Sequence, residues 1–161
     1  LNKNLNFILS KFFNKYIDKG HKKLLMNKNL YQPQFDSFYN NFEFEIVNYI
    51  DNLKNVKWWH RIDVNSNEFF LNGWKKNKIF PDFLIKKESK NSNLIEYFFI
   101  ESKGKHIENS EDSEYKKSLF KYLNSLANKS QKSNKTFSND IFNYLMVNEN
   151  DWKSALTKIL K

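Results

Sequence analysis

Two carboxylates and one lysine are placed in the chain so that they could act together on a phosphate. Asp82 follows Pro81, whereas Glu101 and Lys103 come directly after the longest apolar run, residues 94–100. Carboxylate oxygens are the ligands that a hard cation such as Mg²⁺ prefers. A bound cation that polarises a phosphate and acidifies water, next to an ammonium group that offsets developing charge, supplies what phosphodiester hydrolysis needs.

The two segments that carry these residues must be neighbouring strands for the chemistry to work. Residues 79–87 and 94–103 read as two strands joined by a polar turn, whose tip we place between Asn91 and Ser92. Opposed residue numbers then add up to 183, so Asp82 faces Glu101, and directly opposed Cβ atoms lie about 4.5–5.5 Å apart. Alternation along the strand puts Lys103 on the same face as Glu101.

The flanking residues fit this arrangement. Pro81 has no backbone donor, so it ends or distorts its strand and presents Asp82 at the rim of the sheet. Gly104 allows the chain to turn sharply after Lys103.

The tripeptide Glu-Ser-Lys occurs twice, at residues 88–90 and 101–103, so the tripeptide by itself says little. The first copy lies in the polar turn and is expected to be solvated. In a plainer interpretation, Glu101 and Lys103 form an ion pair at a strand end and Asp82 is simply exposed. The apolar strand before the second copy, the Pro-Asp on its partner and the register favour the catalytic interpretation.

The rest of the chain predicts one α/β domain with an N-terminal appendage. Apolar spacing predicts an amphipathic helix over residues 5–17, ended by Gly20, and we assign residues 1–30 to a helical appendage or linker and 31–161 to the domain. Within the domain we expect, in order, a helix at 38–53, strands at 56–62, 67–73, 79–87 and 94–103, a helix capped by Asp112 or Ser113, a loop at 128–140, a strand at 141–147 and a helix at 150–160. This order predicts a mixed sheet covered on both sides.

Composition narrows the possible partners and compartments. The net charge is +9 and the pI about 9.5, but Lys and Asn are abundant everywhere, as in a protein from an A/T-rich genome. Only one of the 27 basic residues is an arginine, Arg61, which favours phosphate contacts by lysine over base-specific reading. The chain has no cysteine and no apolar run of about 18 residues, so we expect a cytoplasmic protein that is not in a membrane. Because it begins with Leu, we expect it to be part of a longer protein.

The order of these motifs resembles a known enzyme superfamily. Pro81-Asp82, then Glu101-Ser102-Lys103 after an apolar strand, looks like the PD-(D/E)xK nuclease signature. From about residue 30 to 126, the succession of segments resembles the C-terminal endonuclease domain of type III restriction enzyme Res subunits. The resemblance implies a three-layer α/β/α restriction-endonuclease-like core and a Mg²⁺-dependent DNA endonuclease, in which Mn²⁺ can substitute.

The same resemblance implies roles for single residues. Asp82, Glu101 and the backbone carbonyl of Ser102 would bind the metal, and Lys103 would be the catalytic lysine. Members often add a glutamate from the first helix, for which we choose Glu45 over Glu43. The candidate DNA contacts are Lys116, on the helix that follows, and Arg61, which lacks the Asn that tends to follow in the family.

The implied partners are DNA, an upstream helicase or ATPase domain and a target-recognition subunit. Two alternatives stay open at this point. One is a non-catalytic nucleic-acid-binding or assembly domain that keeps the nuclease fold, and the other is a repair or transposition nuclease of the same superfamily.

Overall fold

The computed structural model describes residues 19–64, 69–88, 95–105, 110–132 and 140–161. Their elements follow in chain order: β1 (Lys23–Leu24), β2 (Gln34–Phe35), the 3₁₀ turn η1 (Asp36–Phe38), α2 (Asn41–Asp51), β3 (Val56–Arg61), β4 (Phe83–Glu88), β5 (Ile95–Lys103), α3 (Glu111–Lys132), β6 (Asp140–Asn148) and α4 (Trp152–Leu160). The helix predicted over residues 5–17 lies outside the described residues.

The main sheet is mixed and has four strands in the order β3-β4-β5-β6. β3, β4 and β5 are antiparallel neighbours, whereas β5 and β6 run parallel and are joined through α3. β5 is therefore an inner strand, as predicted, and its central residues Phe98 to Glu101 are all buried. A strand buried on both faces reads as a continuous apolar run, and residues 97–100, Tyr-Phe-Phe-Ile, form such a run.

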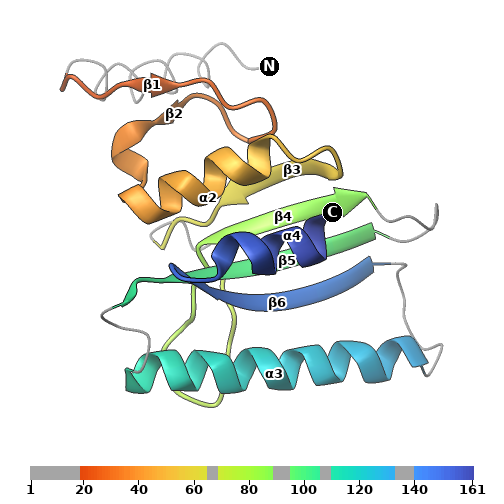
Figure 1. Cartoon of the computed structure of the whole chain (residues 1–161). Helices are drawn as coiled ribbons and strands as arrows, with labels where there is room; N and C mark the ends of the chain where they lie inside the picture. Colours follow the sequence, from red (N-terminus) through yellow and green to blue (C-terminus); the bar gives the residue numbers. More distant parts are fainter. Residues whose placement is uncertain (1–18, 65–68, 89–94, 106–109, 133–139) are drawn as a thin grey trace, which may run out of the picture.

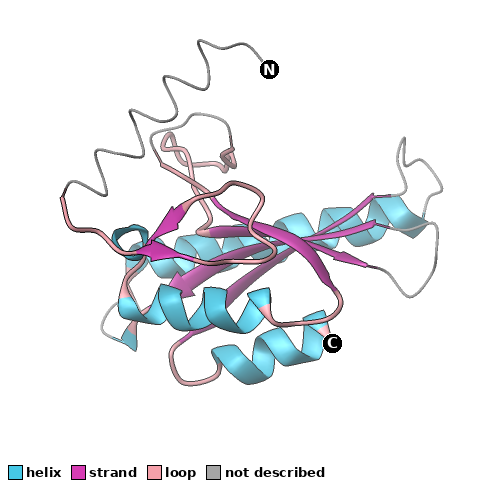
Figure 2. Ribbon diagram, turned by 90° about the horizontal axis from the view of Figure 1, so that it is seen from above, coloured by secondary structure: helices cyan, strands magenta, loops and turns pink. Residues whose placement is uncertain are grey.

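Helices cover both faces of this sheet, and α2 and α4 lie on the same side (Figures 1 and 2). α2 begins with a capping box, in which Asn40 Oδ1 accepts from the Glu43 amide and Glu43 Oε2 accepts from the Asn40 amide. Its buried face packs with alternate strand residues and with α4 into the largest core cluster, which includes Ile46, Val47, Ile50, Trp59, Phe83, Ile85, Phe98, Ile100, Val147, Leu156 and Leu160.

α3 covers the opposite face, where the other set of alternating strand residues points. Leu84 and Phe99 form a second buried cluster there, and Tyr144 of β6 contacts Phe120 of α3. Glu101 and Lys103 have the same strand parity as Phe99, so both project toward the side of α3.

Part of the predicted appendage packs onto the domain. Met26 belongs to the largest core cluster, and residues 28–30 run alongside β3 through hydrogen bonds between Trp59 and both Lys28 and Leu30. The buried carboxylate of Asp51 accepts from the Asn27 and Lys28 amides and from the Trp59 indole. The described residues up to Leu30 are therefore held by the body of the domain.

Three details differ from the prediction. The strand expected at 67–73 is absent from its described residues, 69–73, where the Leu71–Ile79 bridge is isolated. α3 begins at Glu111, and the Ser110 hydroxyl accepts from the Ser113 amide, so Ser110 serves where Asp112 or Ser113 was expected to cap. α3 also continues to Lys132, because its lysine, serine and glutamine residues tolerate a helix better than their polar character suggested.

Among the residues that the structure describes, no helix is long and apolar enough to cross a membrane.

Candidate active site

The pairing of β4 with β5 has the predicted register. Phe83 pairs with Ile100 and Leu84 with Phe99, so opposed numbers add up to 183. β4 begins at Phe83, and Asp82 stands one residue before it, at the position opposite Glu101. Asp82 is held there because its carbonyl accepts from the Ile62 amide, 2.9 Å away.

The side chain of Asp82 turns toward the end of β5. Its Oδ2 accepts hydrogen bonds from both the amide and the hydroxyl of Ser102, each 2.6 Å long. Ser102 thus fixes the Asp82 carboxylate next to Glu101. Whether the Ser102 carbonyl binds a metal stays a prediction.

Glu101 is the centre of a buried charged cluster, since only 3% of its surface is exposed. Its Oε1 lies 3.0 Å from Lys103 Nζ and 2.7 Å from Lys116 Nζ. Asp112, in the first turn of α3, lies 3.6 Å from the Lys103 ammonium and 3.4 Å from that of Lys116. Two lysines, Lys103 and Lys116, therefore meet three carboxylates at one end of the sheet. The carboxylates are those of Asp82, Glu101 and Asp112.

The electrostatics of the cluster are dominated by Glu101. Burial raises the pKa of Glu101, and the negative charge of Asp82 raises it further, whereas Lys116 and Lys103 lower it. The net direction is upward, so the lysines do not fully compensate the burial of this carboxylate. Burial lowers the pKa of Lys116, but the charge of Glu101 and its hydrogen bond, aided by Asp112, outweigh this and raise it overall.

A cavity of about 430 Å³ opens at this cluster. It is lined by residues at the ends of β4, β5 and β6, namely Asp82, Glu101, Ser102, Lys103, Gly104 and Glu149, and at the start of α2 by Asn40, Asn41, Phe42 and Glu43. The predicted metal ligands and the predicted catalytic lysine therefore share one cavity.

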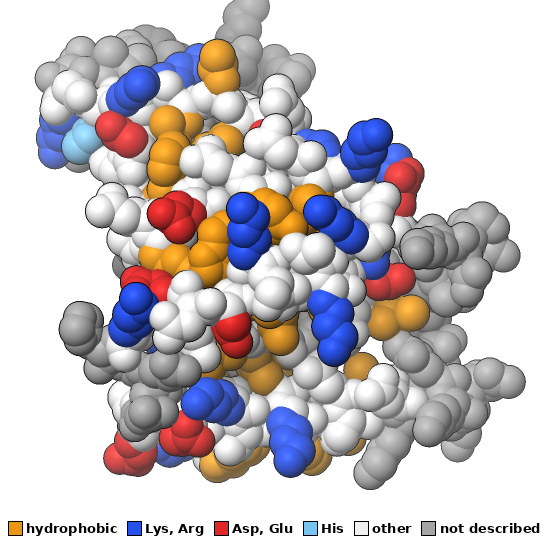
Figure 3. Space-filling model, in the orientation of Figure 1, with side chains coloured by type: hydrophobic (Ala, Val, Ile, Leu, Met, Phe, Trp, Pro, Cys, Tyr) orange, Lys and Arg blue, Asp and Glu red, His pale blue; other side chains and the backbone are white. Residues whose placement is uncertain are grey.

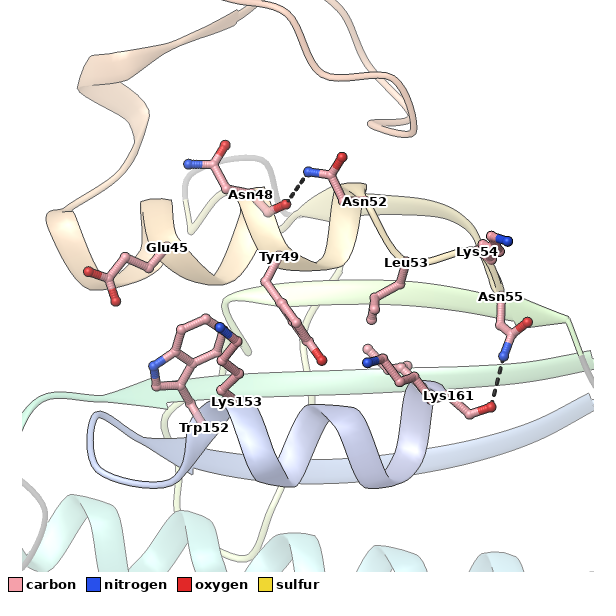
Figure 4. Close-up of a pocket in the computed structure, with 11 residues that line it drawn as sticks. Glu45, Asn48, Tyr49, Asn52, Leu53, Lys54, Asn55, Trp152, Lys153 and Lys161 are labelled. Carbon is pink, nitrogen blue, oxygen red and sulfur yellow. Dashed lines mark hydrogen bonds between the residues drawn. The ribbon is translucent and has the colours of Figure 1, made fainter.

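Glu43, rather than Glu45, is the first-helix glutamate that reaches this cavity. Two residues correspond to about 200° around a helix, so the two side chains point in nearly opposite directions. Glu45 is exposed and lines a different groove, between α2 and α4, together with Tyr49 and Trp152 (Figure 4). The geometry thus does not support the choice of Glu45.

The remaining candidates occupy unequal positions. Arg61 Nη2 lies 3.7 Å from Glu43 Oε2, and the Arg61 guanidinium carbon lies 5.8 Å from the centre of the Tyr39 ring, so this side chain contacts neighbours at the start of α2. Lys116 was expected to lie just beyond the site, and the structure places its ammonium on Glu101 itself. Their contacts with DNA stay predictions.

The donors present fit a divalent cation. Glu101 Oε2 is buried and has no hydrogen-bond partner in the described part of the chain, which leaves an acceptor directed at no protein donor. Within the residues that the structure describes, no group of three or more His, Cys, Asp or Glu side chains is arranged to hold a metal. Two carboxylates, completed by a carbonyl and water, suit Mg²⁺, which is usually bound by one or two carboxylates and keeps several waters.

Sequence reasoning gave three residues of this site other places: it ranked Glu43 below Glu45, named Asp112 as a possible helix cap and expected Lys116 just beyond the site. Glu43 was passed over, although Asn40 followed three residues later by Glu43 is a capping-box signature that places this glutamate at the helix start. Asp112 and Lys116 stand four residues apart, a spacing that puts both on one helix face. Nothing in the sequence showed that this face would turn toward Glu101.

Comparison of the chain with protein-family models, with curated proteins and with solved structures finds no match. Function is therefore inferred from the geometry and chemistry of the site.

Proposed function

We propose that this chain is a Mg²⁺-dependent nuclease domain of the PD-(D/E)xK type that hydrolyses phosphodiester bonds in DNA. The observation that carries the proposal is the convergence of Asp82, Glu101 and Lys103 on one cavity, with a buried oxygen of Glu101 lacking a donor. A four-stranded mixed sheet with helices on both faces is compatible with the restriction-endonuclease-like core that this assignment requires.

Each residue of the cluster has a defined task in this proposal. Asp82 and Glu101 hold the cation, with the Ser102 carbonyl as a third ligand and Mn²⁺ as an alternative ion. When bound, Mg²⁺ supplies a Lewis acid that polarises the phosphodiester and lowers the pKa of a bound water. Lys103 stabilises the negative charge that develops on the phosphate oxygens, a task that requires its ammonium to reach into the cavity that it lines.

Lys116 and Asp112 keep the cluster in order. Lys116 donates to Glu101 Oε1, which leaves Oε2 for a cation, and Asp112 lies near both ammonium groups. The choice of oxygen matters because a lysine on Oε2 would compete directly with the metal. Glu43 is the glutamate that can add to the site from the first helix.

The wider setting is also part of the proposal. We infer a cytoplasmic enzyme in which a helicase or ATPase domain and a target-recognition subunit supply the motor and the target choice, as in a type III-like restriction or defence system. DNA is the substrate, with Arg61 and Lys116 as candidate contacts. Lysines on the face in Figure 3 are dispersed over the surface, so phosphate contacts would come from several elements.

A metal titration combined with a cleavage assay tests the proposal. Wild-type protein and Lys103→Met should both gain thermal stability from Mg²⁺ or Mn²⁺, because the ligands are intact in both, but only the wild type should cleave plasmid DNA. Loss of one donor that stabilises charge in the transition state typically costs about 10²–10³ in rate. The assay includes any partner subunits that cleavage needs.

The same measurements separate the alternative of a non-catalytic binding or assembly domain. Such a domain has no reason to be stabilised by Mg²⁺. No metal-dependent change in the unfolding temperature of the wild type, together with no cleavage in either metal, would overturn the nuclease proposal.

A further inference from the structure

A loop between β3 and β4 presents an exposed tryptophan among lysines, close to the candidate active site. Leu71 and Ile79 exchange two backbone hydrogen bonds of 2.7 and 2.9 Å, which close the base of the loop. Residues 72–78, here called the Trp74 loop, read Asn-Gly-Trp-Lys-Lys-Asn-Lys and contain no acidic residue. Trp74 is 62% exposed, although a side chain this large and apolar is usually covered.

Contacts with α3 fix the position of this loop. The Lys75 amide donates to the Tyr115 hydroxyl over 3.1 Å, and the Trp74 ring meets the Tyr115 ring edge-on with centroids 5.0 Å apart. Gly73 is required here, since a Cβ at this position would come 2.0 Å from the Tyr115 hydroxyl oxygen. Tyr115 itself is buried with Ile79 and Leu119. The loop is therefore anchored to α3 while the indole stays in solvent.

The chemistry of the loop suits an unpaired nucleotide strand. An exposed indole offers a stacking surface for any base, and nearby ammonium groups attract the phosphates between bases. Lys75, Lys76 and Lys78 are all exposed. Lys75 pairs with Glu111 at 3.0 Å, but the Glu111 side chain is 92% exposed, so this pair is weak and easily exchanged for a phosphate contact.

The loop is continuous with the candidate active site. A cavity of about 710 Å³ is lined by Lys75, Lys78 and Phe80 from the loop side and by Asp112, Tyr115 and Lys116 from α3. Asp112 and Lys116 also contact the charged cluster, through Lys103 and Glu101 respectively. Lys116 thus adjoins both the charged cluster and the cavity that Lys75 and Lys78 line, and Trp74 stands next to Lys75 on the same loop.

We propose that the Trp74 loop binds single-stranded DNA, with an unpaired base stacked on the Trp74 indole and phosphates held by Lys75, Lys76 and Lys78. As a binding site, the loop needs no metal. A role of the loop in substrate choice rests on the proposed nuclease function. In that role, the loop makes DNA with an unpaired segment beside the cleaved phosphodiester the preferred substrate.

Fluorescence anisotropy with a labelled oligo-dT strand and a labelled duplex of equal length, both in EDTA, tests the binding site. The wild type should bind oligo-dT more tightly than the duplex. Trp74→Ala should weaken oligo-dT binding about 5- to 150-fold, the usual range for one stacked base. Trp74→Phe should restore most of the affinity, because it keeps an aromatic face.

A charge control and a folding control complete the experiment. Changing Lys75, Lys76 and Lys78 to Gln should weaken binding and reduce its salt dependence, whereas the same change at Lys54, Lys153 and Lys158, which lie on the α2 and α4 side, should do neither. Unfolding temperatures of all variants should match the wild type, since the changed side chains are exposed.

Two results would overturn the inference: tighter binding of the duplex than of oligo-dT, or Trp74→Ala binding oligo-dT within twofold of the wild type. Cleavage of DNA in Mg²⁺ is measured separately. Trp74-dependent binding with neither cleavage nor a metal-dependent change in unfolding temperature would overturn only the nuclease proposal, and cleavage with Trp74-independent binding would overturn only the single-strand site.

Discussion

Glu88 and Glu101, the glutamates of the two Glu-Ser-Lys copies, lie at opposite ends of the antiparallel pair β4 and β5, and their surroundings differ. Glu88 ends β4, pairs with Ile95 and forms an ion pair with Lys57 in which both side chains are more than half exposed. Glu101, near the end of β5, is buried among Lys103, Lys116 and Asp82. The same residue type is thus an ordinary surface charge in one place and the centre of a charged cluster in the other.

The difference shows that burial, rather than the tripeptide, sets the environment of Glu101 apart from that of Glu88. An exposed ion pair such as Glu88 with Lys57 contributes about 0–1 kcal/mol, because water screens both charges. Burial removes water from a carboxylate and so disfavours its charged form. Burial and the negative charge of Asp82 therefore raise the pKa of Glu101. In the proposed metal site, a bound divalent cation would offset the unfavourable negative charge of Glu101, whereas water already screens the exposed charge of Glu88.

The strongest test of this contrast removes each glutamate in turn. Glu101→Ala should reduce Mg²⁺-dependent DNA cleavage at least about 100-fold, because it deletes a metal ligand. Even mutation of a residue that only orients a metal ligand typically lowers metal affinity or activity about 10–100-fold. Glu88→Ala should leave cleavage within about twofold, since an exposed substitution costs within about 0.5 kcal/mol of stability. Steady-state cleavage of plasmid DNA measures both.

Folding must be controlled in this pair, because Glu101 lies on an inner strand. Circular dichroism and thermal unfolding of Glu101→Ala and of the closer isostere Glu101→Gln would show whether lost cleavage reflects lost structure. If folded Glu101→Gln cleaves as well as Glu88→Ala, burial has not created the site and the contrast is broken.

The second test asks whether the cluster depends on its neighbours on α3. Lys116 and Lys117 both pair with an acidic residue of their own helix, Asp112 and Glu114, but only Lys116 reaches Glu101. Lys116→Met should lower cleavage about 10- to 100-fold, as expected for a residue that orients a ligand, and should change the Mg²⁺ concentration needed for half-maximal activity. Lys117→Met should change neither, and equal effects of the two would remove Lys116 from the site.

The backbone of the site followed from the sequence because strand pairing depends on local patterns. The apolar run 94–100, the turn-forming residues between the strands and the period of two gave the register in which Asp82 stands opposite Glu101. β3, β6, α2 and α4 were also placed within a few residues. These elements carry strong periodicity and clear end signals.

The side chains that complete the site did not follow, because they depend on how separate elements pack. The contact of Lys116 with Glu101 requires the angle of α3 across the sheet, which no periodicity specifies. The choice between Glu43 and Glu45 required the rotation of α2, and its capping box would have indicated Glu43. The segment at 69–73 has the aromatic content of a strand, but its pairing is limited to the isolated Leu71–Ile79 bridge, while Leu71 packs with Tyr115 and Leu119 of α3 and Phe69 lies beside Phe99.

The third test uses pH to sharpen the contrast between the two glutamates. The folded protein holds the Glu101 proton more tightly than the unfolded chain does, so metal-free stability falls as pH rises from the ordinary value of 4.5 through the raised pKa. Mg²⁺ needs the deprotonated carboxylate. Its stabilising effect should therefore be largest above the raised pKa and disappear below it.

Thermal unfolding with and without Mg²⁺ across pH 4–8 measures this effect. A Mg²⁺ concentration of about ten times the Kd should raise the Tm by roughly 3–6 °C at the upper end of the range. Glu101→Gln should show no such increase at any pH, whereas Glu88→Gln should follow the wild type. A Tm increase that is independent of pH would mean that the ion binds away from Glu101.

The smallest expected effect repeats the contrast within α2, where Glu43 faces the cavity and Glu45 is exposed in the other groove. Glu43→Ala should lower the free energy of unfolding by about 1 kcal/mol through loss of the capping box, and Glu45→Ala by no more than about 0.5 kcal/mol. Glu43→Gln keeps a side chain that can close the capping box, so its stability should match that of the wild type. Because this variant lacks the negative charge, its cleavage should still fall about tenfold if the carboxylate assists the site. Urea unfolding and plasmid cleavage measure the two quantities separately. Full cleavage by Glu43→Gln would confine Glu43 to capping α2, and a larger loss of cleavage in Glu45→Gln would return the role to the exposed glutamate.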